Sequence, residues 1–386
     1  MAPFKVAHIV YSWLPVTQNW VFTQLRFNDA CVPTVVSMTG EHEGQFPVER
    51  RFTAFPSTFT GKVGLFMARY WIRQPAGFLR TVLAGTAPDI IHGHFSHESW
   101  RILPIARSME LPLITTFYGL DVDKLPRRKA WKRRYKELFS YGTRFLVEGP
   151  FMGKRLEAIG CPAEKIRVVA LGIDRSLYGS AERTGSENGG PVKVLFTGLG
   201  REKKGAPDAA ASFILAARRQ PRLELHLIGD GGYRPKVERM LREAQLLHRA
   251  VFHGYIPFDR YRTLLSECDI VLVPSRYAKD GDCEGGAPVV CIEALASGVP
   301  VVGTRHCDIP YVVAHGESGL LSAEGDRESL SRDLVLLSND AALRQSMGER
   351  GRELVARQHD ITEQVRKITG IYNEVISRKK GPVSHG

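Results

Sequence analysis

The feature that most constrains the fold is a regular alternation between short apolar runs and longer segments with helical periodicity. The runs that we predict as strands are 5–11, 34–37, 90–92, 113–117, 144–147, 193–197, 224–228, 250–253, 270–274 and 300–303. Alternation of this kind is typical of parallel sheets covered by helices on both faces. Because the series occurs twice, the sequence predicts an α/β protein with two doubly wound, Rossmann-like domains.

A polar segment rich in Ser, Glu, Asn and Gly separates the two series. We therefore predict an N-terminal domain over 1–178, a linker over 179–191, a C-terminal domain over 192–360, a terminal helix over 361–377 that packs back on the N-terminal domain, and a tail over 378–386. A chain of 386 residues is long enough for two domains. Because open α/β sheets bind ligands at the carboxyl ends of their strands, we expect the domains to face a cleft that holds the active site.

The segment 282–300 carries two carboxylates around a glycine-rich turn. Glu284 precedes Gly285, Gly286, Ala287 and Pro288, and Glu293 lies on the apolar helix that follows. Free backbone N–H groups at such a turn bind anions. A buried carboxylate requires a partner, which ligand hydroxyls would supply. The pattern favours a ligand with both phosphate and hydroxyl groups, such as a nucleotide sugar. The alternative is that Glu293 faces solvent and Glu284 is an ordinary loop acid.

Three other strand ends in the C-terminal half are candidate donor-binding elements. In 195–205, Gly198 and Gly200 allow close approach of the backbone to a ligand, and Arg201 with Lys203 or Lys204 can neutralise a diphosphate. The alternative is an ordinary turn from a strand to a helix. The other two elements contain Tyr255 with Ile256, which could offer backbone groups to a nucleobase, and Ser275.

Polar residues also follow predicted strands of the N-terminal half. His92, His94 and His97 lie within six residues, but their spacing lacks an acidic ligand, so we expect no metal site there. His94 is instead a candidate lining residue of the cleft. Tyr118 is, with His94, a candidate catalytic residue, and the candidates for acceptor binding are Gln18, Asn19, His97 and Asp121. For each of them, a core histidine or a capping residue is the alternative.

Positive charge is concentrated in the N-terminal half. Residues 1–175 contain 24 of the 53 Lys and Arg and 14 of the 41 Asp and Glu, a balance of +10 against +2 for the rest of the chain. The densest cluster lies in 127–139, where basic residues alternate with aromatic ones. A basic amphipathic helix of this kind can lie on an anionic membrane surface. The alternative is a solvated face whose aromatic side chains pack on the core, and no motif indicates nucleic-acid binding.

The cysteines and the apolar runs indicate a cytoplasmic protein, and the basic segment 127–139 would allow it to be peripheral at the inner face of the cell membrane. The six cysteines have no paired spacing, which favours reduced thiols. The sequence shows no apolar run long enough for a transmembrane helix and no signal-peptide pattern at its N-terminus.

Taken together, these motifs resemble the retaining glycosyltransferases of the GT-B fold, family 4, of the type that assembles bacterial polysaccharides. The resemblance extends over almost the whole chain and is strongest in the segments 253–257, 274–288 and 293–302, with further matches at 172–174, 202–205, 229–231 and 316–321.

The resemblance implies roles for the candidate residues. Lys204 would hold the donor diphosphate, Glu284 and the amides of Gly285 and Gly286 would contact the sugar and phosphate, and Glu293 would bind the ribose hydroxyls. The basic N-terminal domain would take a saccharide or lipid-linked acceptor. No metal or other cofactor is expected, because cations and helix N-termini stabilise the leaving diphosphate.

Three departures from the family pattern stand out. Glu284 and Glu293 enclose eight residues where the family commonly has seven. Leu199 occupies the usual position of an arginine, for which Arg201 could substitute. Tyr118 replaces a histidine of many members and, with an ordinary pKa near 10, would be a poor general base.

The sequence thus predicts an enzyme that transfers a hexosyl group from a nucleotide sugar to a saccharide or glycolipid hydroxyl, with retention of configuration. Two alternatives are a nucleotide-sugar epimerase of the GT-B fold and a non-catalytic protein that binds membranes or nucleic acid.

Overall fold

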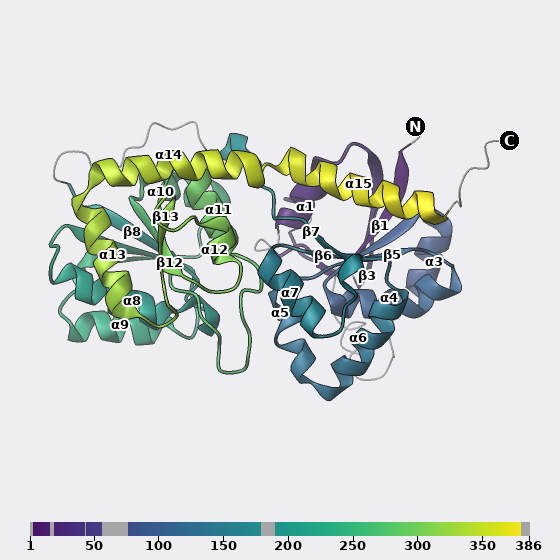
Figure 1. Ribbon diagram of the computed structural model, residues 1–386, viewed down its shortest axis with the longest axis horizontal. Helices are drawn as coiled ribbons and strands as arrows, with labels where there is room; N and C mark the ends of the chain where they lie inside the picture. Colours follow the sequence, from purple (N-terminus) through teal and green to yellow (C-terminus); the bar gives the residue numbers. More distant parts are fainter. Residues whose placement is uncertain (1–2, 16–18, 43, 56–75, 179–189, 380–386) are drawn as a thin grey trace. The chain divides into compact units, whose positions relative to one another are not determined.

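The computed structural model describes residues 3–15, 19–42, 44–55, 76–178 and 190–379. They form two compact units. Unit 1 comprises Met1–Glu148, Gly153–Gly172 and Ile361–Gly386, and unit 2 comprises Gly149–Met152 and Ile173–Asp360. Each unit is built around one parallel sheet, as the repeated alternation in the sequence predicts (Figure 1).

Among its described residues, unit 1 has a seven-stranded parallel sheet in the order β3-β2-β1-β4-β5-β6-β7. The strands are β1 (Phe4–Trp13), β2 (Cys31–Gly40), β3 (Arg51–Phe55), β4 (Ile90–His94), β5 (Leu113–Thr116), β6 (Arg144–Val147) and β7 (Ile166–Val168). The helices of this part of the chain are α1 (Asn19–Arg26), α3 (Ala76–Thr86), α4 (Ser96–Ser108), α5 (Gly119–Val122), α6 (Lys129–Tyr141), α7 (Pro150–Ala158) and α15 (Ile361–Lys379).

The described part of unit 2 has a six-stranded parallel sheet in the order β10-β9-β8-β11-β12-β13. Its strands are β8 (Val192–Thr197), β9 (Leu223–Ile228), β10 (Ala250–Gly254), β11 (Ile270–Val273), β12 (Val301–Thr304) and β13 (Gly319–Ser322). Its helices are α8 (Ala206–Ala217), α9 (Arg234–Glu243), α10 (Phe258–Glu267), α11 (Val289–Ala296), α12 (Ile309–Val312), α13 (Arg327–Asn339) and α14 (Ala341–Gln358), with short 3₁₀ turns η4 (Arg175–Leu177) and η5 (Glu202–Lys204).

Central strands of both sheets are buried along their whole length, which explains why they read as continuous apolar runs. All four residues of β11 and of β12 are buried. Helices on both faces of a parallel sheet exclude water from both sides of each strand. In unit 2, α8 and α9 each carry proline in their first turn, where the missing N–H has no helical partner to lose.

Helix α15 completes the core of unit 1, although it is the last element of the chain. Ile368, Ile371, Tyr372 and Val375 pack in one buried cluster with residues of the central strands, namely Val6, Ile90, Ile114 and Leu146. Arg144 of β6 also pairs with Glu374 of α15. The helix therefore belongs to the N-terminal Rossmann-like unit.

The unit boundary differs from the one read from the sequence. Residues 173–178, assigned above to the N-terminal domain, belong to unit 2. Ile173 donates its N–H to the His359 carbonyl, and the Tyr178 hydroxyl donates to Glu293. These hydrogen bonds attach the segment to unit 2, and no apolar period in the sequence indicates them. Most of the predicted linker, residues 179–189, lies outside the described residues.

Candidate functional site

In unit 2, the candidate donor residues gather where the order of the strands reverses. Strands β8 and β11 are neighbours at the centre of the sheet, and the chain leaves them toward opposite edges. Lys204 follows β8, and Ser275 follows β11. Crevices at such switch points are the usual ligand sites of open α/β sheets.

Lys204, Ser275 and Glu284 form a compact ionic cluster at this point. The Lys204 Nζ lies 3.0 Å and 3.1 Å from the two carboxylate oxygens of Glu284, and the Ser275 hydroxyl donates to the same carboxylate over 2.9 Å. Burial alone would raise the pKa of Glu284, but Lys204 and Lys203 outweigh it and hold that pKa below its ordinary value. The cluster therefore consists of an ionised acid and a cation that keep each other in place.

The two other predicted cations occupy different positions. Lys203 donates to the Cys283 carbonyl over 2.8 Å and lies 3.5 Å from Asp282, so it holds the loop before Glu284. Arg201 is exposed at the turn between β8 and η5. Leu199, which stands where family members have arginine, is fully buried in the core of unit 2. A cation from this turn therefore has to come from Arg201 or a lysine.

Two predicted glycines allow the backbone segments at this edge to approach closely. A Cβ on Gly198, whose φ is 117°, would lie 2.6 Å from the Cγ of Lys204. A Cβ on Gly200 would lie 3.0 Å from the carbonyl oxygen of Asp230. Larger residues would displace the turn that carries Lys204, so these glycines have a packing role whether or not a ligand is bound.

The loop from Gly285 to Pro288 contains the extra residue relative to the family pattern. Gly285, Gly286, Ala287 and Pro288 are all buried, and Pro288 is the N-cap of α11. Gly285 has a φ of 76°, a conformation that favours glycine. The loop thus accommodates its length by a left-handed turn next to Glu284.

His306 anchors this loop and was not selected from the sequence. The backbone N–H of Glu284 donates to His306 Nε2 over 3.2 Å, and His306 Nδ1 lies 2.7 Å from a carboxylate oxygen of Glu324. Burial lowers the pKa of His306, but contacts with Cys307 and Glu324 outweigh burial and raise it. Its only sequence signal was its position after β12, at the carboxyl edge of the sheet.

Glu293 lies on α11, is 7% exposed and accepts hydrogen bonds from Tyr178 and Tyr261. The sequence predicted that ligand hydroxyls would partner this acid, whereas in the structure two tyrosine hydroxyls do so, and neither tyrosine was predicted. By contrast, Tyr255 is 82% exposed, with its hydroxyl 3.3 Å from the Asp230 carbonyl, and Ile256 is partly buried. An exposed aromatic ring after β10 is available for stacking.

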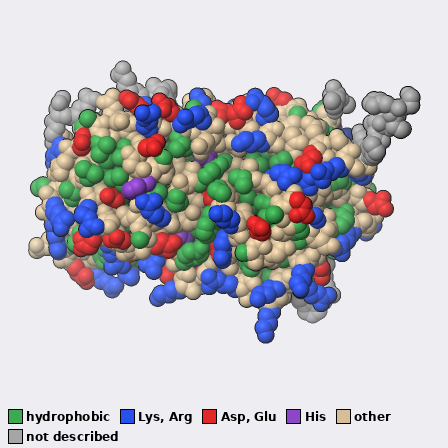
Figure 2. Space-filling view, in the orientation of Figure 1, with side chains coloured by type: hydrophobic (Ala, Val, Ile, Leu, Met, Phe, Trp, Pro, Cys, Tyr) green, Lys and Arg blue, Asp and Glu red, His purple; other side chains and the backbone are tan. Residues whose placement is uncertain are grey.

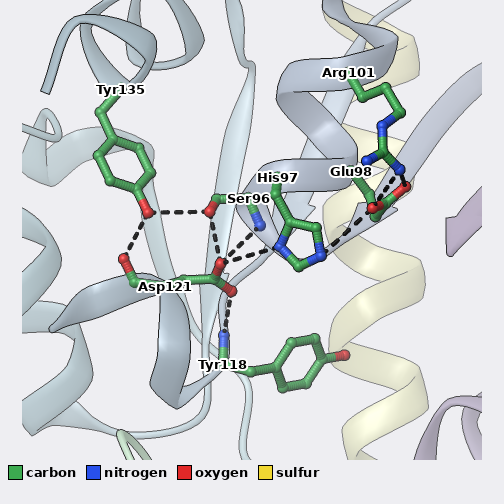
Figure 3. A network of polar contacts seen from close by, with 7 residues as sticks. All are labelled: Ser96, His97, Glu98, Arg101, Tyr118, Asp121 and Tyr135. Carbon is green, nitrogen blue, oxygen red and sulfur yellow. Dashed lines mark hydrogen bonds and ion pairs between the residues drawn. The ribbon is translucent and has the colours of Figure 1, made fainter. Parts of the chain in front are cut away.

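The candidate residues of unit 1 form a second polar network, shown in Figure 3. Asp121 is fully buried and accepts hydrogen bonds from the Ser96 hydroxyl over 2.6 Å, the Ser96 N–H over 3.2 Å and the Tyr118 N–H over 3.0 Å. The Tyr135 hydroxyl donates to the Asp121 carbonyl over 2.6 Å. Asp121 therefore joins the start of α4 to the start of α5.

His97 lies at the edge of this network. Its Nδ1 is 3.8 Å from Asp121, and its Nε2 is 3.4 Å from Glu98, which in turn pairs with Arg101 over 2.8 Å (Figure 3). Burial lowers the pKa of His97, but the two acids outweigh it and raise that pKa. Helix α4 begins at Ser96, so His97 and Glu98 lie in its first turn. In the sequence, apolar residues with helical spacing begin only at residue 100.

His94 belongs to a buried cluster with His8 and His92. One nitrogen atom from each of the three rings lies within 4.8 Å of the other two. His8 Nδ1 and His94 Nε2 are 3.1 Å apart, whereas the rings of His92 and His94 are nearly parallel, at 21° with centroids 4.5 Å apart. Burial lowers the pKa of all three histidines and so favours their neutral forms, which can hydrogen-bond to one another or hold a metal ion.

Tyr118 and His94 are linked by a hydrogen bond of 3.0 Å between the phenol and Nδ1. Burial lowers the pKa of His94 to about 3 and raises the pKa of Tyr118. Both groups are therefore neutral at pH 7. Asn19 begins α1, and Gln18 lies outside the described residues.

Comparison with known proteins identifies the family. Residues 181–354 match the model described as "Glycosyl transferases group 1", and residues 31–177 match the model described as "Glycosyltransferase Family 4". The amylovoran biosynthesis glycosyltransferase AmsK of Erwinia amylovora is 32% identical over 285 residues, which cover 72% of this chain and 69% of AmsK. The chain belongs to glycosyltransferase family 4.

Other family 4 relatives and structures agree with this assignment. The putative colanic acid biosynthesis glycosyltransferase WcaL of Salmonella typhimurium is 30% identical over 275 residues, covering 70% of this glycosyltransferase and 66% of WcaL. The matches thus span about two thirds of these relatives. Among solved structures, Anabaena HepE in complex with UDP and glucose superposes with a TM-score of 0.75 at 16% identity, covering 96% of this chain and 99% of HepE. WaaG, a glycosyltransferase involved in lipopolysaccharide biosynthesis, gives a TM-score of 0.66 at 16% identity, covering 95% and 99%. These likenesses confirm the predicted GT-B fold.

Proposed function

We propose that this glycosyltransferase moves a hexosyl group from a nucleotide sugar to a hydroxyl of a saccharide or lipid-linked acceptor, with retention of configuration, in the assembly of a cell-surface polysaccharide. The names of its relatives, the amylovoran biosynthesis glycosyltransferase AmsK and the putative colanic acid biosynthesis glycosyltransferase WcaL, support the pathway class. The complex of its structural neighbour HepE with UDP-glucose supports a nucleotide-sugar donor.

The observation that carries the proposal is the Lys204–Glu284 pair at the strand-order reversal of unit 2. The scissile bond of the donor joins the sugar to the diphosphate, and the pair offers one charged group to each of these two parts. The ammonium group attracts the diphosphate, which gains negative charge as the bond to the sugar breaks. The carboxylate, held by Ser275, remains as an acceptor for sugar hydroxyls. In the absence of donor, each group neutralises the other.

Proton transfer in this proposal uses a phosphate oxygen of the donor. Neutral Tyr118 is a poor base, and the low pKa of His94 makes it a weak one. A departing diphosphate gains basicity during bond cleavage and lies next to the acceptor hydroxyl when attack occurs on the same face as departure. The reaction would then need no side-chain base.

We also propose that the transfer requires no metal ion or other cofactor. Lys204 and Arg201 follow β8 and would compensate the diphosphate charge together with the N-terminus of α8, whose first turn follows Gly205. The proposal predicts full activity in the presence of a chelator.

The decisive experiment incubates the purified protein with UDP-, GDP- and ADP-hexoses, with and without lipid-linked saccharide acceptors. A donor that binds only the folded state raises the melting temperature, which first selects the base. NMR of the product then gives the configuration of the new bond. Transfer with retention supports the proposal, and an inverted product refutes retention. Conversion of the donor alone to an epimer would establish the epimerase alternative instead.

We propose an anionic membrane surface as a second partner. In the structure, cationic side chains of α6 are available for this contact, and its aromatic side chains are not. Trp131, Tyr135, Leu138 and Phe139 of α6 are buried and unavailable to lipid. Most of the exposed residues are cationic, and Figure 2 shows Lys and Arg side chains along the lower edge, where Figure 1 places α6. The members of this α6 patch are Arg127, Arg128, Lys129, Lys132, Arg133 and Lys136. The surface therefore suits adsorption to lipid headgroups without insertion.

Vesicle co-sedimentation tests the α6 patch. Vesicles with anionic lipids should retain the protein at low salt and release it at high salt, and neutral vesicles should not retain it. Charge reversal of Lys132, Arg133 and Lys136 should weaken binding by about 100-fold or more, since each cation near the surface contributes about 1 kcal/mol. Binding that resists both salt and charge reversal would contradict an electrostatic contact.

Among the helices that the structure describes, none combines the length and the hydrophobicity that a membrane span requires.

A further inference from the structure

Both carboxylate oxygens of Glu293 are held by tyrosine hydroxyls. Tyr178 donates to Oε1 over 2.7 Å, and Tyr261 donates to Oε2 over 2.6 Å. Hydrogen bonds from neutral hydroxyls to a charged acceptor are short and strong. Because one tyrosine binds each oxygen, rotation of the carboxylate about its terminal bond would break both bonds. The plane of the Glu293 carboxylate is therefore fixed.

The two tyrosines come from different elements that are themselves tied together. Tyr178 directly follows η4, and Tyr261 lies on α10. The ring of Phe258 contacts both, with centroids 6.5 Å from Tyr178 and 6.1 Å from Tyr261. Arg262 of α10 also donates to the Leu177 carbonyl over 2.9 Å. Neither hydroxyl can move away without disturbing this packing.

The tyrosines leave part of the capacity of the carboxylate unused. An ionised carboxylate has about four acceptor positions, and the tyrosines occupy one on each oxygen. One position therefore remains on each oxygen, and the side chain keeps 7% of its surface exposed. Two neighbouring acceptors in a fixed plane match two vicinal hydroxyls, which a ribose presents at its 2′ and 3′ positions. Binding through a fixed plane loses less entropy than binding through a mobile side chain.

We propose that Tyr178 and Tyr261 are positioning residues that make Glu293 selective for ribonucleotide over 2′-deoxyribonucleotide donors. The inference rests on the proposed function, because it concerns the nucleotide half of the same donor. The tyrosines need not touch the ribose. They direct the free acceptor positions of Glu293 toward both hydroxyls, so that a donor lacking the 2′-hydroxyl leaves one acceptor position without a partner.

The test measures the dissociation constants of UDP, GDP and ADP and of their 2′-deoxy counterparts for the full-length protein. For the base that binds, the wild type should prefer the ribonucleotide by about 10- to 100-fold, the range for one hydrogen bond to a charged group. Tyr178→Phe and Tyr261→Phe should each reduce this ratio several-fold, and the double variant should bring it close to one. Tyr311→Phe, a partly exposed tyrosine on α12, is the matched control and should keep the wild-type ratio.

The ratio separates positioning from a purely structural role. Phe variants that bind both nucleotides more weakly by the same factor, with the ratio intact, would overturn the inference. A wild type that binds both nucleotides equally would overturn it as well. If no nucleoside diphosphate binds the wild type, the proposed function fails together with the inference. Glu293→Gln gives an independent check, because its amide replaces one acceptor by a donor and should also abolish the preference.

Discussion

The two units each bury a carboxylate at the carboxyl edge of a sheet, but they satisfy it in different ways. In unit 1, Asp121 accepts hydrogen bonds from two backbone N–H groups and a hydroxyl. In unit 2, Glu284 is held by the mobile end of Lys204 and by a serine hydroxyl. Backbone donors cannot leave without local unfolding, whereas an ammonium group can move to a ligand. Asp121 therefore links two structural elements permanently, whereas Glu284 can exchange its lysine partner for a ligand.

The buried histidines show the same contrast. His8, His92 and His94 of unit 1 face one another, and burial lowers the pKa of each. His306 of unit 2 faces Glu324 and Cys307, which raise its pKa despite its burial. Burial thus shifts His8, His92 and His94 toward the neutral form, whereas the neighbours of His306 shift it toward the charged form.

The largest expected effect on activity follows from removal of the Lys204 ammonium group. Lys204→Ala should lower kcat by about 100- to 1,000-fold, because the developing charge on the diphosphate loses a preorganised partner. Steady-state kinetics with the donor identified by thermal shift measures the change. Lys236→Ala, an exposed lysine on α9, is the control. A Lys204 variant with wild-type turnover would remove this residue from the site.

Removal of the Asp121 carboxylate should lower the stability of unit 1 and leave donor binding unchanged. Asp121→Ala leaves the N–H groups of Ser96 and Tyr118 without their acceptor, which should lower the free energy of unfolding of unit 1 by about 3 kcal/mol. Urea unfolding followed by pulse proteolysis and mass spectrometry reports each unit. Asp29→Ala, at an exposed position, should change little. A weaker affinity of unit 2 for nucleotide in Asp121→Ala would contradict the separation of roles.

Acidification should change the contributions of His94 and His306 to stability in opposite directions. A histidine with a lowered folded pKa loses stability as the pH falls below its ordinary value of 6.5, because only the unfolded chain takes up the proton. At about pH 5 the loss is roughly 2 kcal/mol for His94, whose folded pKa is about 3. A histidine with a raised folded pKa contributes stability below 6.5 and loses that contribution as the pH rises through the folded value. The His306 contribution to unit 2 should therefore persist in acid and vanish at higher pH.

The same pulse-proteolysis measurement over a pH series checks this prediction. His94→Gln should reduce the loss of stability of unit 1 in acid, and His306→Gln should remove a contribution that stabilises unit 2 in acid. The exposed His42→Asn serves as the control, because Asn tolerates the positive φ of 47° at this position. Changes of the same sign in the two variants would contradict the assigned pKa directions.

The smallest expected effect concerns the exposed cation of the donor turn. Arg201→Ala should raise the donor KM by less than about tenfold, and the effect should shrink with added salt, because water and ions screen an exposed charge. Donor KM at low and high salt measures this. An effect as large as that of Lys204→Ala would show that Arg201 moves onto the diphosphate and replaces the arginine that Leu199 displaces.

The sequence predicted the elements whose pattern is local, and it failed where burial depends on distant partners. Periodicity located the central strands and most helices, and the two glycine-rich turns led to Lys204 and Glu284. The edge strands β3 and β7 were missed because they are only partly buried and lack a continuous apolar run, and β13 was missed because only two of its residues, Leu320 and Leu321, have apolar side chains. Tyr178, Tyr261 and His306 were missed because their partners lie up to 115 residues away in the chain. Asp121 was read as an acceptor ligand because sequence spacing does not show which N–H groups a carboxylate will face.

The position of α15 in unit 1 has a consequence for how the protein is made. Unit 1 is assembled from three separate stretches of chain, and the last of them, residues 361–386, is synthesised after the whole of unit 2. During translation one apolar face of the unit 1 sheet therefore stays exposed until α15 is synthesised. Unit 2, by contrast, can fold as soon as it leaves the ribosome. Ile368, Ile371, Tyr372 and Val375 cover that face only after the whole of unit 2 has been synthesised. A nascent chain arrested before α15 should bind chaperones through unit 1, and a nascent chain that includes α15 should lose that dependence.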